Sequence, residues 1–374
     1  MIITFFRSSS LSQYLDMCHM QYFMTYVLGQ PSPANQKADM GSAGHLALEW
    51  LALLKIQYDE GKERLTLKTK AIDLDIHRDE IYTTTRISDS EVDKINYTRR
   101  NKSIYLPTAK MSYGQVRYGS AVVNKLIDAS YKYFSLVVSP NHPWTQASYK
   151  QVWNCVWMAL EQNNRHYDPR FRKIISPEQR FDLKIEKEWA KFNYFYQGGN
   201  IDGYLGLKGT IDLVTEVDEN TIEIVDWKFG RRFNWGQNTE KTFESLQEDK
   251  QLMFYYYAAR QIFPNHKNII LTINFIRDGG AFSAPFDDSI LPKIENVIKE
   301  TFNEIRENHR PKLLDPTYQD HRCNKFCPFF KRKVEGQPYC RYISTMIDEL
   351  GMDYVTETEK SEGFSFSYYE NPGE

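Results

Sequence analysis

The sequence predicts an α/β protein in which a mixed β-sheet is flanked by helices and preceded by a large N-terminal helical region. Two observations carry this prediction. Apolar residues recur at helical spacing before the sheet begins, most clearly in 121–134 and 148–160. From Arg180 onward the pattern changes to short runs rich in β-branched and aromatic residues, which are bounded by turn residues and interrupted by one long helical stretch.

The individual elements follow from local signals along the chain. Serines at positions 8–10 are favoured N-cap residues, so we expect a first helix over about 8–28. A second helix is expected to begin near Gly41, and residues 60–170 carry mostly helical patterns. The residues after Thr356 are acidic and aromatic without periodicity, which predicts a disordered tail. We expect strands at 181–186, 207–216, 222–229, 268–276 and 281–286, and further helices at 243–263 and 289–307.

The bulk composition excludes several classes of protein. The chain has 374 residues, of which 41% are hydrophobic, and this is enough to bury a sizeable core. Its net charge of −2 provides no global positive field, so any nucleic-acid site must be a local patch. Because no long apolar run and no secretory leader are evident, we expect a cytoplasmic protein that is not secreted and has no membrane partner. Five cysteines in a chain of this size do not predict a disulfide framework.

The strongest chemical signal lies in the two consecutive strands on either side of Glu219. If a hairpin is centred there, Asp212 and Asp226 lie directly opposite one another, because both are seven residues from that centre. Lys228 returns to the same face by the strand period of two. The other face is expected to carry the core residues Ile211, Leu213, Val225 and Trp227.

Two carboxylates and one ammonium on a single face of an apolar hairpin require compensation. Opposed like charges are destabilising, and burying them unpaired costs several kcal/mol. A divalent cation between Asp212 and Asp226 is the simplest solution, so the hairpin predicts a metal site. The alternative is a structural pair of Asp226 with Lys228 and one spare surface aspartate.

Polar residues also follow the hairpin on the expected helix 243–263. Gln251 and Tyr255 are four residues apart and therefore share one face of that helix. Gln251 is placed to hold a phosphate or a water molecule beside the lysine. A polar stripe on an otherwise apolar helix is the competing interpretation. Directly after the second strand, Arg231 and Arg232 are candidates for phosphate contacts, although charged runs are usually solvated faces.

The cysteines are unevenly distributed. Cys323, Cys327 and Cys340 lie close together near the C-terminus, and Cys18 lies in the first expected helix. Together they supply the four thiolates that an iron–sulfur cluster or a zinc ion requires. Four unrelated free thiols are the alternative. Cys155 lies in a Trp-rich helical segment and is expected to be a buried apolar residue.

Taken in order, these motifs resemble the RecB-like branch of the PD-(D/E)XK nucleases, which includes the AddB nuclease domain, iron–sulfur exonucleases and CRISPR-adaptation nucleases. The resemblance covers most of the chain in outline, apart from the segment between the helix of His45 and the sheet. The matching residues are Ser8, Ser10, Tyr14, Cys18, Tyr22, Tyr26, Val27, Gly41, His45, Glu49, Gly209, Asp212, Asp226, Lys228, Gln251, Tyr255, Cys323, Cys327, Pro328 and Cys340.

The resemblance implies a restriction-endonuclease-like core and a set of metal ligands. It assigns Mg²⁺ or Mn²⁺ to His45, Asp212, Asp226 and the carbonyl of Trp227, which agrees with the preference of these cations for oxygen and imidazole ligands. It assigns Lys228 to the attacking water. Gln251 and Tyr255 would then support the lysine and the DNA backbone.

The resemblance also implies a 4Fe–4S cluster bound by Cys18, Cys323, Cys327 and Cys340, which would join the two ends of the chain. Gaps of three and twelve residues between the later cysteines are wider than is usual in the family, so zinc stays as the less favoured alternative. The implied organisation is an N-terminal helical region at 1–175, a nuclease core at 176–310, a cysteine region at 311–355 and a tail at 356–374.

The implied function is a metal-dependent DNA nuclease, most simply an exonuclease on single-stranded DNA or duplex ends in recombination, repair or replication. The alternative is a catalytically silent or partner-gated subunit that binds DNA ends in a recombination or integration complex. No Gly-x-x-x-x-Gly-Lys-Ser/Thr motif is present, so a helicase or recombinase partner would be a separate chain. A DNA substrate extends the expected location from the cytoplasm to the nucleoid or nucleus.

Overall fold

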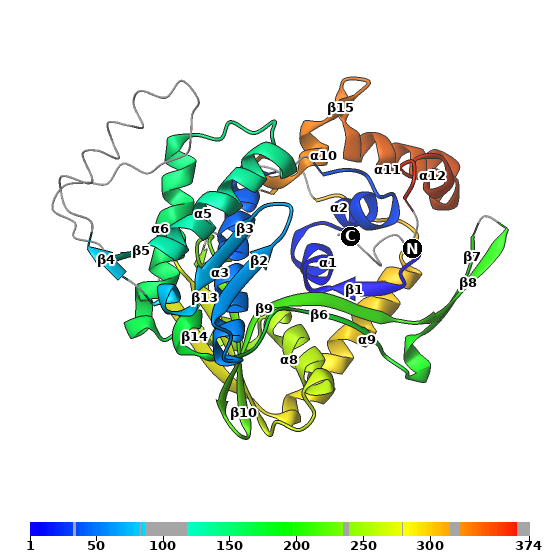
Figure 1. Ribbon diagram of the computed structural model, residues 1–374. Helices are drawn as coiled ribbons and strands as arrows, with labels where there is room; N and C mark the ends of the chain where they lie inside the picture. Colours follow the sequence, from blue (N-terminus) through cyan, green and yellow to red (C-terminus); the bar gives the residue numbers. More distant parts are fainter. Residues whose placement is uncertain are drawn as a thin grey trace.

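The computed structural model describes residues 1–32, 35–82, 84–86, 118–196, 198–234, 239–278, 280–314 and 322–364. Its centre is a six-stranded sheet in the order β1-β9-β10-β13-β14, with β6 pairing along β9 (Figure 1). The pairs β1/β9 and β10/β13 are parallel, whereas β6/β9, β9/β10 and β13/β14 are antiparallel. The strands are β1 (Phe5–Arg7), β6 (Lys173–Lys184), β9 (Gly206–Asp218), β10 (Thr221–Lys228), β13 (Asn268–Phe275) and β14 (Gly280–Phe286).

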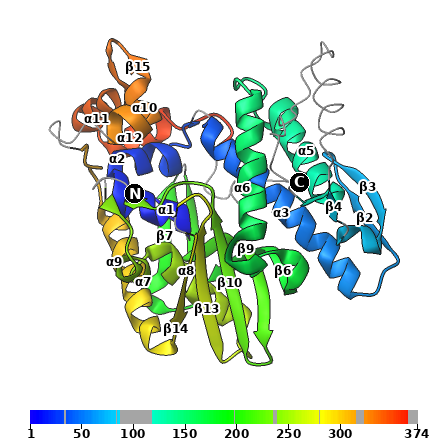
Figure 2. The same cartoon turned by 90° about the vertical axis from the view of Figure 1, so that its left-hand side faces the viewer.

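Helices cover both faces of this sheet, which confirms the predicted fold class (Figure 2). On one face, α3 (Gln36–Asp59), α5 (Ala121–Tyr133) and α6 (Gln146–Arg165) form an apolar cluster with Leu213, Val225 and Trp227. On the other, α8 (Lys250–Ile262) and α9 (Leu291–Glu307) enclose a second cluster that includes Ile222 and Ile224. Ile211 packs in this second cluster, so its expected place beside Leu213 is wrong. It lies where β9 runs beyond its pairing with β10.

The central hairpin has the predicted register. The pairs from Ile222↔Glu216 to Val225↔Leu213 are centred on Glu219, and a bulge is confined to the turn beside Thr221. Continuing the same register by one residue places Asp226 opposite Asp212. The side chains of β10 are buried from Thr221 to Trp227, because β10 lies between β9 and β13 and is covered on both faces.

The first expected helix is interrupted at Cys18. The chain forms α1 (Ser8–Ser12), a π-helical turn (Gln13–Met17), α2 (His19–Tyr22) and a second π-helical turn (Phe23–Val27). Cys18 itself is extended, with φ −162° and ψ 126°. A tertiary contact accompanies the break, since the N–H of Met20 donates to the carbonyl of Lys312 at 3.2 Å.

Other boundaries also differ from the expectation. Helix α3 begins at Gln36 rather than near Gly41, because Asn35 caps it by accepting from the N–H of Lys37. The expected helix 243–263 is divided into α7 (Phe243–Gln247) and α8, where Asp249 caps the second helix. Part of the expected helical region 60–170 is instead a hairpin of β2 (Arg64–Lys68) and β3 (Asp73–His77), whose side chains alternate between exposed and buried. Short pairs are formed by β4 (Thr84–Arg86) with β5 (Tyr118–Ser120) and by β11 (Phe233–Asn234) with β12 (Thr239–Glu240).

The C-terminal helices lie beside the N-terminal segment that contains α2 (Figures 1 and 2). Helix α11 (Tyr339–Leu350) packs against α2, and it is accompanied by α10 (Pro328–Lys331), β15 (Lys333–Val334), β16 (Gln337–Pro338) and α12 (Met352–Thr358). Part of the segment expected as a disordered tail is thus helical, and Phe364 is only 8% exposed. Residues 365–374 of that expected tail lie outside the described residues.

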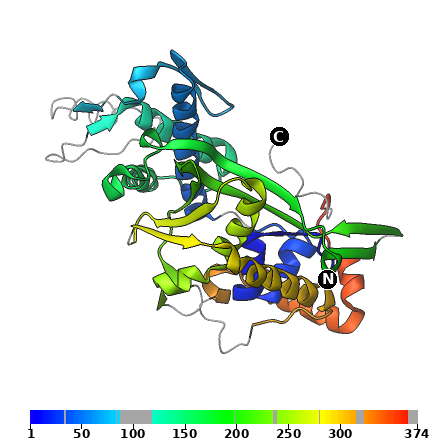
Figure 3. The same ribbon diagram turned by 90° about the horizontal axis from the view of Figure 1, so that it is seen from below.

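Beyond the sheet, β7 (Lys191–Tyr196) and β8 (Gly199–Tyr204) form a two-stranded ribbon that projects from the body of the molecule (Figure 3). Among the described helices, none combines the length and the apolar character that crossing a bilayer requires.

Candidate functional site

Asp212 and Asp226 are buried side by side on β9 and β10. Asp212 is 8% exposed and Asp226 only 1% exposed. The backbone N–H of Trp227 donates to Asp212 Oδ2 at 2.8 Å, so the first carboxylate is held directly by the strand that carries the second. The indole ring of Trp227 is 1% exposed in the opposite core, and only its backbone belongs to the site.

Lys228 and two residues of α8 surround Asp226. The ammonium of Lys228 lies 2.7 Å from Asp226 Oδ2 and 3.0 Å from Oδ1. The amide of Gln251 donates to Asp226 Oδ1 at 3.3 Å and to the hydroxyl of Tyr255 at 2.9 Å. Asp249 fixes the first turn of α8 by accepting from the N–H of Gln251 at 2.9 Å. The structure therefore brings together all five residues that were predicted to be catalytic.

His45 reaches the hairpin from α3. Its Nδ1 lies 3.4 Å from Asp212 Oδ2. The ring rests against Phe229, with the two ring centroids 5.2 Å apart, and edge-on to Trp227 at 6.5 Å. This histidine is not an isolated core residue, because its nitrogen faces a buried carboxylate.

Burial and neighbouring charges shift the pKa of each titratable group in the site. Burial raises the pKa of Asp226 to about 6, although Lys228 opposes this change. Burial alone would raise the pKa of Asp212, but His45 and Lys228 together lower it below its usual range. The carboxylates in turn raise the pKa of His45 and of Lys228 in spite of their burial. Since one carboxylate resists ionisation while the other is held ionised, an added positive charge would stabilise both.

Glu178 joins this site although the sequence did not reveal it. It lies on β6 between the pairs Pro177↔Leu213 and Gln179↔Ile211, and so faces Asp212 across the strands. Ligand atoms of His45, Glu178 and Asp212 all lie within 4.8 Å of one another, and this is the one such group among the described residues. The expected strand 181–186 began too late to include Glu178, since the true strand starts at Lys173.

The backbone and the charge of Glu178 are both unusual. Its φ of 45° lies in the left-handed region, which costs a non-glycine residue of order 1–3 kcal/mol and is frequent at functional sites. Burial raises its pKa to about 8, and Asp212 and Glu49 add to the increase. A carboxylate held in this way is most readily ionised beside a cation.

The residues present fit a divalent cation. Two ligands on opposite sides of one Mg²⁺ or Mn²⁺ lie about 4.2 Å apart, given bonds of about 2.1 Å. The ligand atoms of His45, Glu178 and Asp212 lie within 4.8 Å of one another, a limit that admits such a spacing. Asp226 lies outside this group, and its carboxylate accepts from Lys228 and Gln251.

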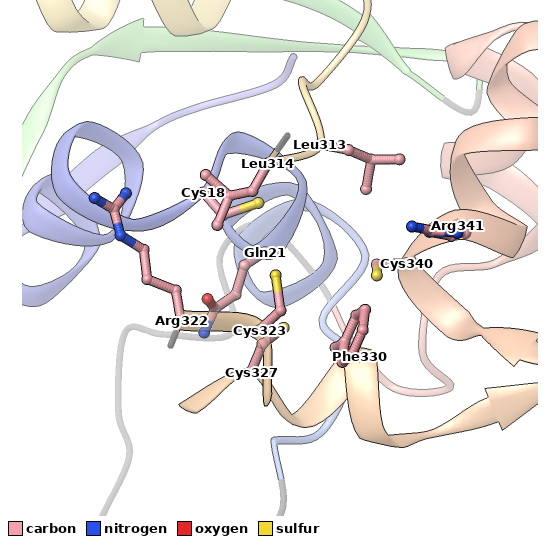
Figure 4. Close-up of a pocket in the computed structure, with 10 residues that line it drawn as sticks. All are labelled: Cys18, Gln21, Leu313, Leu314, Arg322, Cys323, Cys327, Phe330, Cys340 and Arg341. Atoms are coloured by element: carbon pink, nitrogen blue, oxygen red, sulfur yellow. The ribbon is translucent and has the colours of Figure 1, made fainter. Parts of the chain in front are cut away.

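Four of the five cysteines line a second site. Figure 4 shows the side chains of Cys18, Cys323, Cys327 and Cys340 around one pocket of about 510 Å³. Burial, together with the neighbouring thiols, raises the pKa of Cys327 to about 11 and that of Cys340 to about 12. Cys155 instead lies in the core beside α3 and α5, at 3% exposure.

The distances between these sulfur atoms can be compared with those of a tetrahedral zinc site. Among the described residues, no three of the sulfur atoms lie within 4.8 Å of one another. A tetrahedral zinc ion with bonds of about 2.3 Å would place its sulfur ligands about 3.8 Å apart. The pocket is therefore more open than a closed zinc site.

The two arginines after β10 have different surroundings. Arg231 is exposed. Arg232 binds Glu240 at 2.9 Å and lies over the ring of Phe282 at 4.8 Å, while its N–H donates to Asp278. Arg232 thus has a structural role that the sequence did not indicate.

A sequence model of the PD-(D/E)XK nuclease superfamily matches residues 109–332, about three fifths of the chain. The match contains Glu178, both aspartates of the hairpin, Lys228 and the two residues of α8, whereas His45 precedes it. A search among curated proteins found no relative of the chain.

Proposed function

The chain belongs to the PD-(D/E)XK nuclease superfamily, whose members are metal-dependent phosphodiesterases, and we propose that it is a RecB-like deoxyribonuclease acting as an exonuclease on single-stranded DNA or duplex ends. One observation carries the proposal: Asp212, Asp226, Lys228 and His45 converge from three elements into one buried site. A purely structural ion pair of Asp226 with Lys228 would not require the second carboxylate or the imidazole.

The protein groups divide into ligands and positioning residues. His45, Asp212, Asp226 and the carbonyl of Trp227 would hold Mg²⁺ or Mn²⁺. When bound, such a cation polarises the phosphate and lowers the pKa of a water molecule. The hydrogen bond from Trp227 N–H keeps Asp212 in place throughout, because it is anchored in the sheet.

Lys228 would orient the attacking water and offset the charge that develops on the phosphate. Its ammonium is held against Asp226, which fixes its direction along the strand. Gln251 links α8 to that carboxylate by donating hydrogen bonds to Asp226 and to the hydroxyl of Tyr255. Both residues of α8 therefore act as positioning residues. Exposed Arg231, next to β10, is the better candidate for a contact with the DNA backbone.

We further propose that Cys18, Cys323, Cys327 and Cys340 hold a 4Fe–4S cluster. They line one pocket, and their spacing is wider than a single zinc ion requires. The cluster would join α2 to the C-terminal helices, so its binding free energy would contribute to folding. Zinc is the second candidate.

The test is cleavage of single- and double-stranded DNA labelled at the 5′ or the 3′ end, with Mg²⁺ or Mn²⁺ added to metal-free protein. Progressive shortening from one end that Asp226→Asn abolishes is the expected result. Asp218→Asn, an exposed substitution in the same hairpin, is the matched control. Undiminished cleavage by Asp226→Asn would refute the site assignment.

Two other outcomes would change the proposal. If the wild-type protein is inactive alone but active with a helicase or recombinase, the protein is a partner-gated subunit. If it binds DNA ends without cleavage under all of these conditions, it is a silent end-binding subunit.

A further inference from the structure

We infer that Glu178 is a further protein ligand of the catalytic cation, which it would bind together with His45 and Asp212 from α3, β6 and β9. This inference rests on the proposed function, because it concerns the same cation. It adds a ligand that was not among those predicted from the sequence.

Geometry carries the inference. The ligand atoms of His45, Glu178 and Asp212 lie within 4.8 Å of one another, while Asp226 does not join them. Asp226 is instead bound by the ammonium of Lys228 at 2.7 Å and by the amide of Gln251 at 3.3 Å. Of the carboxylates near His45, Glu178 and Asp212 are thus the two that are placed to share one ion with it.

The backbone directs Glu178 into the site. Its φ of 45° interrupts the regular strand geometry of β6 between Pro177 and Gln179, which both keep their pairing with β9. The left-handed conformation is therefore confined to the residue opposite Asp212.

The charges around the three residues favour a cation over further protein contacts. The carboxylates of Asp212 and Glu49 lie near Glu178, and His45 and Arg180 are the basic groups close to it. No hydrogen bond of the Glu178 carboxylate occurs among the contacts of the described residues, whereas Asp212 has both Trp227 N–H and His45.

The donor set predicts which metal is preferred. One imidazole nitrogen and two carboxylates suit Mn²⁺ better than Mg²⁺, which favours oxygen ligands alone.

The experiment measures Mn²⁺ binding to metal-free protein by electron paramagnetic resonance, without DNA. Glu178→Gln preserves the shape of the side chain and should weaken binding about 10-fold or more, in line with the loss of one anchoring group at a metal site. Glu219→Gln, which removes an exposed carboxylate at the turn of the β9–β10 hairpin, should leave the affinity within about 2-fold. The thermal midpoint of metal-free Glu178→Gln should stay close to that of the wild-type protein.

The possible outcomes distinguish an error in the role of Glu178 from an error in the proposed metal centre as a whole. If His45→Ala and Asp212→Asn lose Mn²⁺ but Glu178→Gln binds it like the wild-type protein, Glu178 is not a ligand and only this inference fails. If none of the three substitutions affects binding, the proposed metal centre itself is wrong. If Glu178→Gln does not fold, Glu178→Asp decides: weakened binding by folded protein supports the inference, and unchanged binding overturns it.

Discussion

Gly44 of α3 lies directly against the ring of Phe229, at the end of β10. A Cβ added at Gly44 would be 2.3 Å from two atoms of that ring, closer than any real contact. The neighbouring residue on the helix is His45, whose own ring also packs on Phe229. This close approach of helix and strand therefore sets the position from which the imidazole meets Asp212.

Gly44→Ala should displace α3 and with it His45. We expect the free energy of unfolding to fall by about 1–3 kcal/mol, as for other overpacked cores, and Mn²⁺ affinity to fall with it. Gly41→Ala is the matched control, because its added Cβ would lie 3.7 Å from Phe229 in ordinary contact. Urea unfolding and Mn²⁺ titration of both variants test this, and equal behaviour of the two would contradict it.

Lys228→Met should reduce DNA cleavage about 10²-fold or more, since it removes a charge directed at the reacting phosphate. Asp226 would lose its 2.7 Å partner, so its pKa, which burial already raises to about 6, would rise further. Single-turnover cleavage is the appropriate measurement.

Lys187→Met is the control for Lys228→Met. Lys187 also pairs with a carboxylate, that of Glu295, but at the surface and on a different part of the fold. Its loss should leave the cleavage rate unchanged. A Lys228 variant that cleaves as fast as the Lys187 variant would exclude a catalytic role for the lysine.

The hairpin was predictable from sequence because strand period and turn position fix its register locally. To predict that Asp212, Asp226 and Lys228 share one face, only the position of the hairpin centre at Glu219 was required. Glu178 was not predictable, because a left-handed φ at a non-glycine residue is imposed by tertiary structure and has no pattern of its own.

The N-terminal segment shows the same limit. Its apolar spacing predicts one helix, yet the chain is extended at Cys18 and the N–H of Met20 bonds to a carbonyl some 290 residues later in the sequence. Similarly, β2 and β3 alternate like strands, but they are short and lie within a region of helical patterns. A long-range contact such as that between Met20 and Lys312 can override the local helical propensity of a segment.

Arg231→Ala should change DNA binding, whereas Arg232→Ala should change the stability of the fold. Loss of exposed Arg231 should weaken DNA binding and reduce the slope of log affinity against log salt by about 0.7–0.9, the value for one phosphate contact. Loss of Arg232 should lower the free energy of unfolding by about 1 kcal/mol, because it removes the contacts with Glu240 and Phe282. Binding at several salt concentrations and urea unfolding measure the two effects, and a stability loss in Arg231→Ala alone would reverse the assignment.

Because of His19, the free energy of unfolding should decrease as the pH falls below neutrality. Burial lowers the pKa of His19, and Glu304 offsets this only in part. The unfolded chain then binds the proton more readily than the native protein, so stability present above the ordinary histidine pKa of about 6.5 is lost as the pH falls.

Substitution of His19 by Phe keeps the stacking on Tyr14, where the ring centroids are 4.1 Å apart, but removes the titrating group. The free energy of unfolding of His19→Phe should therefore fall less than that of the wild-type protein between about pH 7.5 and about pH 5.5. Urea unfolding at both values tests this, and parallel profiles would show that His19 does not contribute.

Cys340→Ala should eliminate the proposed iron–sulfur cluster. The wild-type protein, purified without oxygen, is expected to contain iron and sulfide and to show broad visible absorbance. Cys340 lines the thiol pocket, so its removal should abolish that absorbance and lower the thermal midpoint. Cys155→Ala is the matched control: this thiol is also buried but lies in the other core, so the variant should keep its iron. Metal analysis by mass spectrometry decides the result, and stoichiometric zinc without iron in the wild-type protein would replace the cluster with the second candidate.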